Sequence, residues 1–257
     1  MDKIKKILST SLLVGSVILP ISNVYAENID KYLYVGGELG LSEPVVTSFV
    51  HKTSTTKFRL KQSEMYGGRI GYSFYPGMMI EVSGTHQPKY GLTYVLPSFN
   101  VPLPGGASIT VPKTPGKTKV TSNVYTVNWI YELPPQFLGL KPYAIVGAGV
   151  AKISVKPTVT TTDALAPIGL GNSFKFFRLR KSNTNCLTWQ AGGGIAKDIA
   201  ENFSIDVGAK LQVVNDIKIK YDKFDIKTQS FISQSPIKKT IGVWEFTAGF
   251  TFKIPLK

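Results

Sequence analysis

Histidine is scarce in this chain, and the first question is whether either of its two imidazoles could serve catalysis. His86 lies three residues after Ser83 and five after Glu81. A hydrolase of the triad type needs a histidine held between a nucleophile and a carboxylate. We expect His86 to be a surface residue or to lie at the base of a loop, and Glu81 to balance a cation. The chain is predicted not to be an enzyme, and a hydrolase that uses His86 is the most distant alternative.

Nucleotide, metal and redox chemistry find little support. The segments "VGGELG" and "AGGGIAKD" mimic glycine-rich dinucleotide loops, but no helical pattern follows either one. The segment "PGKT" at 115–118 ends like a phosphate-binding loop, but Val111 stands where the first glycine belongs. No Cys/His cluster has metal-ligand spacing. We therefore predict no cofactor, no metal and no nucleic-acid partner. The single cysteine, Cys186, excludes an intrachain disulfide.

Several titratable residues fall at every second position of a predicted strand, so they would lie on the same face of it. In 203–213, Ser204, Asp206 and Lys210 alternate with the apolar residues Phe203 and Ile205. The same reading of other segments predicts an interior ion-pair network that fills the lumen of a closed sheet; its six members are Glu38, Arg69, Glu81, Asp206, Lys210 and Glu245.

Strand-like segments of about ten residues must position these charges, a length that suits a tilted membrane strand. Eight such segments are expected: 32–41, 64–74, 78–86, 120–131, 142–153, 187–198, 203–213 and 241–252. Between them, short turns alternate with four longer connections, 42–63, 87–119, 154–186 and 214–240. Short turns at one end and long loops at the other are typical of outer-membrane barrels. The chain is predicted to be all-β, an eight-stranded antiparallel transmembrane β-barrel with four long extracellular loops and short periplasmic turns.

The first 26 residues read as a secretory signal. "MDKIKK" is basic, "ILSTSLLVGSVIL" is apolar, and "VYA" offers small residues to a signal peptidase. We expect cleavage after Ala26, export to the periplasm, and a single outer-membrane barrel domain over 27–257.

Basic residues gather in the four predicted loops of a chain whose net charge is +14. Loop 87–119 is rich in proline, with Pro97, Pro102, Pro104, Pro112 and Pro115 among its residues, and reads as an extended, stiffened projection. In loop 154–186, "FKFFRLRK" interleaves phenylalanines with cations. Such segments can bind anionic partners through charge and aromatic contact. The residues predicted to bind a partner are Lys113, Lys117, Lys119, Lys175, Phe176, Phe177, Arg178, Arg180 and Lys181.

The chain resembles the small outer-membrane barrels of the OmpA and opacity-protein type. The resemblance rests on patches such as "YVGGELG", "PYAIVGAGV" and "WQAGGGIAKDI" and on the final aromatic strand, and covers nearly all of 27–257. The Lys- and Ile-rich style also resembles small surface barrels and adhesins of rickettsia-like bacteria. Chains of this type usually end on an aromatic residue, whereas this one continues past Phe252 as "KIPLK".

The resemblance implies a surface protein, an adhesin or an envelope structural protein, whose basic loops bind anionic partners. Expected partners are outer-membrane lipid and lipopolysaccharide, together with host surface or matrix molecules, and a monomer is favoured. The alternative is a small porin or channel. Because eight strands leave an interior just filled by side chains, we expect a plugged lumen rather than an aqueous pore.

Overall fold

The computed structural model describes residues 31–45, 48–51, 54–102, 108–134, 139–163, 174–225, 228 and 230–256, which form sixteen β-strands. Eight strands are long: β1 (Tyr32–Pro44), β4 (Ser63–Tyr75), β5 (Met78–Leu96), β8 (Thr114–Glu132), β9 (Leu140–Val155), β12 (Ser182–Ala200), β13 (Phe203–Ile219) and β16 (Ile237–Pro255). Eight are short: β2 (Ser48–His51), β3 (Ser54–Leu60), β6 (Phe99–Pro102), β7 (Ser108–Val111), β10 (Thr158–Thr162), β11 (Phe174–Leu179), β14 (Tyr221–Asp225) and β15 (Ser230–Ser233). The predicted signal segment, 1–26, lies outside the described residues.

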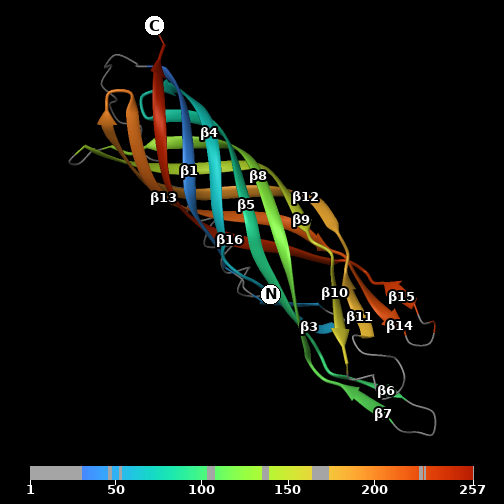
Figure 1. The fold of residues 1–257 in the computed structure, drawn as a ribbon. Coiled ribbons are helices and arrows are strands. Elements are labelled where there is room, and N and C mark those ends of the chain that lie inside the picture. The colour runs from blue at the N-terminus through green and yellow to red at the C-terminus, as the bar shows by residue number, and fades with distance from the viewer. Residues whose placement is uncertain are drawn as a thin grey trace.

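The long strands pair in one closed antiparallel circuit (Figure 1). Its order is β1–β4–β5–β8–β9–β12–β13–β16, and β16 pairs with β1 to complete it. Closure satisfies the backbone hydrogen-bonding groups that an edge strand would leave open. The predicted all-β antiparallel architecture is confirmed, and each of the eight predicted segments lies within one long strand.

The two ends of the circuit differ. At one end, which we call the short-turn end, residues 76–77 join β4 to β5 and residues 201–202 join β12 to β13. Gly77 has a positive φ of 73°, which favours glycine in this tight turn. The opposite end carries the short strands β6, β7, β10, β11, β14 and β15 (Figure 1).

The four segments predicted as long loops are largely strand, and this is a correction to the sequence-based expectation. Their described residues make up a distal extension that continues the barrel. Six long strands, β5, β8, β9, β12, β13 and β16, run on into it, and β3 pairs with β5 beyond the end of β4. The predicted projection 87–119 contains a hairpin of β6 and β7, in which Pro102 pairs with Ser108. The part of the closed circuit that lies between the short turns and the distal extension is called the proximal barrel.

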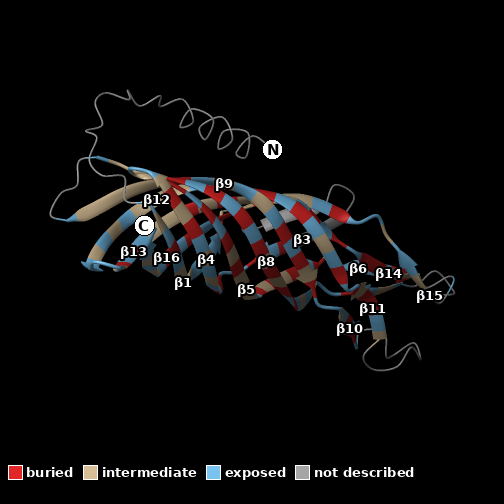
Figure 2. Cartoon of the chain, turned by 90° about the horizontal axis from the view of Figure 1, so that it is seen from above, coloured by how far each residue is buried: buried red, intermediate tan, exposed pale blue. Residues whose placement is uncertain are grey.

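Side chains of the proximal barrel are apolar outside and polar inside. On β13, Ile205 and Val207 are 45% and 58% exposed, whereas Asp206 and Lys210 are each 7% exposed. Figure 2 shows the resulting alternation of buried and exposed bands along the strands. The faces of this strand match the phase read from its sequence.

In the distal extension the interior is apolar instead. Beyond Gln87 on β5, Tyr90, Leu92 and Tyr94 are buried within a large hydrophobic cluster. The change in character falls close to two breaks in register, between Gln87 and Tyr90 in the β5–β8 pair and between Val214 and Ile217 in the β13–β16 pair. The alternation continues across these bulges, but the polar and apolar faces are exchanged, which explains why the sequence pattern was interpreted as loop.

Candidate functional site

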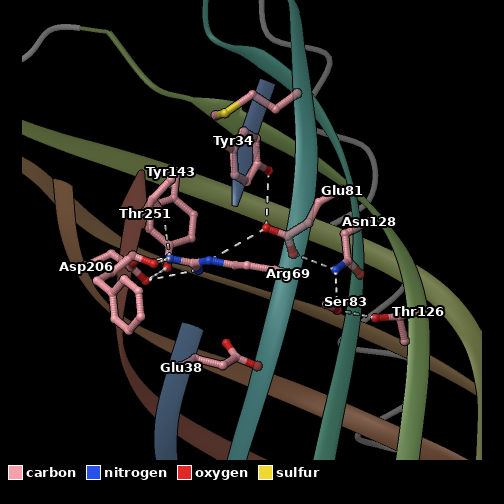
Figure 3. Close-up of polar contacts among 12 residues, drawn as sticks. Tyr34, Glu38, Arg69, Glu81, Ser83, Thr126, Asn128, Tyr143, Asp206 and Thr251 are labelled. Atoms are coloured by element: carbon pink, nitrogen blue, oxygen red, sulfur yellow. Dashed lines mark hydrogen bonds and ion pairs between the residues drawn. The ribbon is translucent and has the colours of Figure 1, made fainter. Parts of the chain in front are cut away.

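Arg69 lies at the centre of the proximal interior (Figure 3). Its Nη1 donates to Asp206 Oδ1 at 3.3 Å, and its Nη2 donates both to Asp206 Oδ2 and to Thr251 Oγ1, the latter at 2.8 Å. Its Nε is 3.9 Å from Glu81 Oε2. The guanidinium therefore joins β4 to both β13 and β5, and it closes the space inside the barrel at this level.

Lys210 forms a second charged group. Its Nζ lies 3.3 Å from both carboxylate oxygens of Glu38 and 3.7 Å from Glu245 Oε2. Glu245 is fully buried, and its Oε1 accepts a hydrogen bond from Gln87 Nε2 at 2.6 Å. Burying charges is unfavourable unless each is paired and hydrogen-bonded, so these contacts are needed to hold the two carboxylates inside the barrel.

All six residues of the predicted interior network therefore meet inside the barrel. Four are carboxylates and two are cations, so the group carries more acidic than basic side chains. Register explains the meeting: Lys210 pairs directly with Glu245, and Arg69 pairs with Gly36 of β1, where a Cβ atom would meet the arginine side chain.

Neutral side chains complete this network, and sequence reasoning missed one of them, Asn128. Asn128 Nδ2 donates to Glu81 Oε1 at 2.9 Å and to Ser83 Oγ at 3.0 Å. Gln190 Nε2 donates to Asn128 Oδ1 at 2.7 Å, and Tyr34 Oη donates to Glu81 Oε2 at 3.1 Å. The signal that could have found Asn128 is its phase, because it alternates with Val127 and Trp129 on β8.

Glycines accommodate the interior tyrosines. A Cβ atom at Gly71 would overlap the ring of Tyr34, and one at Gly194 would overlap the ring of Tyr143. Each tyrosine side chain lies against a glycine of a neighbouring strand and fills the lumen near the short-turn end.

The remaining interior space is small. A cavity of about 70 Å³ lies at the short-turn end beside Tyr34, Arg69 and Tyr143. An apolar cavity of about 40 Å³ lies in the distal extension beside Leu92, Ile153 and Ile241, and it shares no lining residue with the first. Polar side chains, among them Gln87 and Glu245, occupy the level between the two cavities.

The predicted partner-binding residues divide into two sets. Lys113, Lys117 and Lys119 are exposed at the β7–β8 connection and along β8, and Lys175, Arg180 and Lys181 are exposed on or beside β11. These six cations are accessible to an anionic partner.

Phe176 and Phe177 are a correction, because they are 8% and 2% exposed and belong to the hydrophobic cluster of the distal extension. Phe177 lies against Tyr94 and Tyr221, with ring centroids 5.3 and 5.6 Å apart. Segment 174–179 is a paired strand rather than an open loop, so these rings fill a core. Burial also raises the pKa of the Tyr221 phenol, which therefore stays neutral in this core.

Arg178 is also engaged internally. Its Nε and Nη2 donate to Asp222 Oδ2 at 2.9 and 2.5 Å, and its guanidinium lies 4.7 Å from the ring centroid of Phe231. Asp222 is almost fully buried, and it also lies 3.8 Å from Arg180 Nη1. Arg178 therefore links β11 to β14 and β15. Arg180 contributes to this link through Asp222 and is also exposed to an anionic partner.

The structure does not bring His86 and Ser83 together. Ser83 points into the barrel, where its hydroxyl contacts Thr126, whereas His86 lies on the outer face beside Tyr66 and contacts Asn123 Oδ1 at 2.5 Å. Residues three apart on a strand point to opposite faces. Among the side chains that the structure describes, no group of three or more His, Cys, Asp or Glu is placed to hold a metal ion. Within the same residues, no helix is long and apolar enough to cross a membrane.

Comparison with known proteins gives one clear sequence relative. "Uncharacterized protein RP788" of Rickettsia prowazekii (strain Madrid E) is 41% identical over 191 residues, which cover 74% of this chain and 99% of the relative. No protein-family model matches.

Among solved structures, Neisserial surface protein A is 14% identical with a TM-score of 0.45, and the match covers 87% of this chain and 97% of that one. The outer membrane protein OprG of Pseudomonas aeruginosa is 13% identical with a TM-score of 0.45, over 88% and 96% of the two chains.

Proposed function

The chain belongs to the same family as the R. prowazekii protein RP788, and we propose that it is an integral outer-membrane β-barrel whose basic distal extension binds anionic partners at the cell surface. The proposal describes a non-enzymatic surface protein, an adhesin or envelope protein, that is exported by the predicted signal segment.

The observation that carries the membrane part is an apolar belt around the proximal barrel. Leu187, Leu39 and Ile70 are 72%, 67% and 62% exposed, and large apolar side chains point outward from all eight long strands. A soluble monomer rarely exposes a contiguous apolar patch above a few hundred Å². The belt consists of Leu33, Val35, Leu39, Leu41, Tyr66, Ile70, Ile80, Val82, Tyr125, Val127, Trp129, Val146, Val150, Leu187, Ile195, Ile205, Val207, Trp244, Phe246, Phe250 and Phe252.

Lipid explains this belt because its hydrocarbon receives the apolar side chains while the closed circuit leaves no open strand edge in the bilayer. The polar interior is the other half of the pattern expected of a transmembrane barrel. With the short-turn end on the periplasmic side, the distal extension projects from the cell.

Lysines begin directly beyond the belt. Lys119 and Lys152 are exposed on β8 and β9, and Lys218 and Lys238 are exposed and face each other across β13 and β16. Like charges directly opposite on a sheet are unfavourable, and a bound anion would relieve their repulsion. Phosphate groups of lipopolysaccharide in the outer leaflet lie at the level where these lysines would meet them.

The more distal cations, Lys113, Lys117, Lys175, Arg180 and Lys181, extend the same positive field away from the membrane. Such a field steers anionic molecules toward the surface and weakens as salt is added. Sulfated or acidic host and matrix molecules are the class of partner that this field favours.

The test displays the full chain on a non-adherent bacterium and measures attachment to host cells or to immobilised heparin. A variant with Lys113, Lys117 and Lys119 changed to glutamine should bind less, and added salt or soluble heparin should compete with the unchanged chain. The matched control changes Lys31 and Lys197, which are exposed near the short-turn end, to glutamine and should bind normally. Attachment no better than that of the empty host, by correctly inserted protein, would refute partner binding.

A further inference from the structure

A pocket at the tip of the distal extension lies outside the charged surface just described. Its volume is about 220 Å³, and five phenylalanine rings, Leu96, Pro97 and Lys223 line it. It lies where the β6–β7 hairpin meets the four-stranded sheet β10–β11–β14–β15, because Phe174 packs both against the large hydrophobic cluster and against Val101 and Val111 of the hairpin.

The rings are held in place by one another. Phe174 and Phe224 meet edge to face with centroids 4.8 Å apart, and Phe99 lies 5.7 Å from Phe176. Phe176 and Phe177 are buried, whereas Phe99 is 36% exposed at the rim. The pocket therefore has a fixed aromatic floor and an accessible aromatic edge.

Lys223 is the charged residue among the lining side chains, and it is exposed. It lies opposite Phe177 on β11 and opposite Ile232 on β15, so its backbone is fixed in the middle of the sheet. An apolar hollow with one cation in its lining is complementary to an apolar group that has an acidic neighbour.

Size indicates what kind of apolar group fits. An apolar cavity of about 150 Å³ holds a benzene molecule, whereas pockets for drug-sized ligands run to about 300–1,000 Å³. A volume of about 220 Å³ therefore suits one aromatic side chain. Aromatic residues inserted into well-packed pockets are the residues that most often dominate protein–protein binding.

We propose that this pocket receives an aromatic side chain of a partner polypeptide, flanked by acidic residues that pair with Lys223. This inference rests on the proposed surface function. It adds a specific binding pocket to a positively charged surface that would otherwise attract any anion. The aromatic ring would provide contact area, and the neighbouring acid would select the segment that carries it.

The test uses the full chain in lipid nanodiscs and three capped tripeptides, Asp-Trp-Asp, Lys-Trp-Lys and Asp-Ala-Asp, titrated under NMR observation. Asp-Trp-Asp should bind most tightly. Phe99→Ala should weaken it about tenfold because the aromatic rim is lost. Lys223→Glu should reverse the preference between the acidic and the basic peptide.

Matched controls are Ile232→Ala and Lys220→Glu, two exposed positions of the same region that do not line the pocket, and both should bind as the unchanged chain does. Equal binding of the tripeptides, or an unchanged affinity in Phe99→Ala, would overturn the proposal. Tighter binding of decanoate than of Asp-Trp-Asp, lost in Phe99→Ala, would overturn it in favour of an acyl chain.

Heparin binding separates this inference from the proposed function. Phe99→Ala should keep heparin binding and lose the tripeptide, whereas the Lys113, Lys117 and Lys119 variant should show the reverse. If the unchanged chain does not bind heparin but still binds Asp-Trp-Asp, the charged-surface proposal fails and the pocket proposal stands.

Discussion

The proximal barrel and the distal extension are built from the same strands with opposite side-chain patterns. On β5, Val82 faces outward and Glu81 inward, whereas a few residues later Lys89 faces outward and Leu92 inward. The period of two never changes, but the surroundings of the strand do. In the proposed membrane placement, a single strand that passes from lipid to water exchanges its polar and apolar faces, so the position of the exchange would mark the membrane boundary.

The largest effect should come from the polar interior of the proximal barrel. Lys210→Met leaves Glu38 and Glu245 buried without their cation and should lower the free energy of unfolding by about 3–5 kcal/mol. Urea unfolding in lipid vesicles measures the change. Adding Glu38→Gln and Glu245→Gln to the same chain should recover part of the loss. A stable single variant would show that water already solvates this level of the lumen.

The second largest effect should come from a charge on the outer face, which should cost more stability in the proximal barrel than in the distal extension. Val207→Arg in the belt should cost about 2–4 kcal/mol if the side chain lies near the middle of the bilayer. Val159→Arg, at a similarly exposed position of the distal extension, should stay within about 0.5 kcal/mol of the unchanged chain. Equal costs at the two positions would remove the lipid explanation of the belt.

The ion pair that closes the distal sheet should have a smaller and local effect. Asp222→Asn removes the charge that Arg178 and Arg180 share, and hydrogen bonds to charged groups contribute about 1.5–3 kcal/mol. Hydrogen exchange should quicken in β11, β14 and β15 and stay unchanged in β4. Faster exchange throughout both regions would mean that they unfold as one unit.

The smallest effect is expected in ion conductance: the protein should add none to that of the bilayer. The unchanged chain in a planar bilayer should give no steps above the empty membrane, because Arg69 and the residues around Lys210 fill the lumen. Steady, reproducible steps would favour the channel alternative. They would require the network around Arg69 to open.

Prediction from sequence succeeded where one pattern applied throughout. The phase of Asp206 and Lys210 against Ile205 placed the charges inside, and all six of those charges do lie together. Asn128 was missed because a neutral amide, unlike a carboxylate, carries no charge that requires an ion-pair partner. The distal strands were not predicted because Pro88 and Lys89 break the register on β5, and beyond this break the apolar residues face inward and the polar residues outward.

Phe176 and Phe177 show a different limit. Adjacent aromatic residues between cations suggest an exposed adhesive segment when only composition is considered. Their burial depends on Tyr94 and Tyr221, which are distant in sequence and meet them only after β11 has paired with β14. Contacts of this kind are set by tertiary structure, and local pattern does not contain them.

The filled lumen also constrains the order of events during assembly. Once the tyrosines and the two ion-pair groups have closed the interior, no passage through the barrel remains that is wide enough for a polypeptide. In the proposed membrane placement, the distal segments, with their lysines and buried aromatics, must therefore be carried across the bilayer before β16 joins β1. Translocation of the distal segments would then have to precede closure of the proximal barrel.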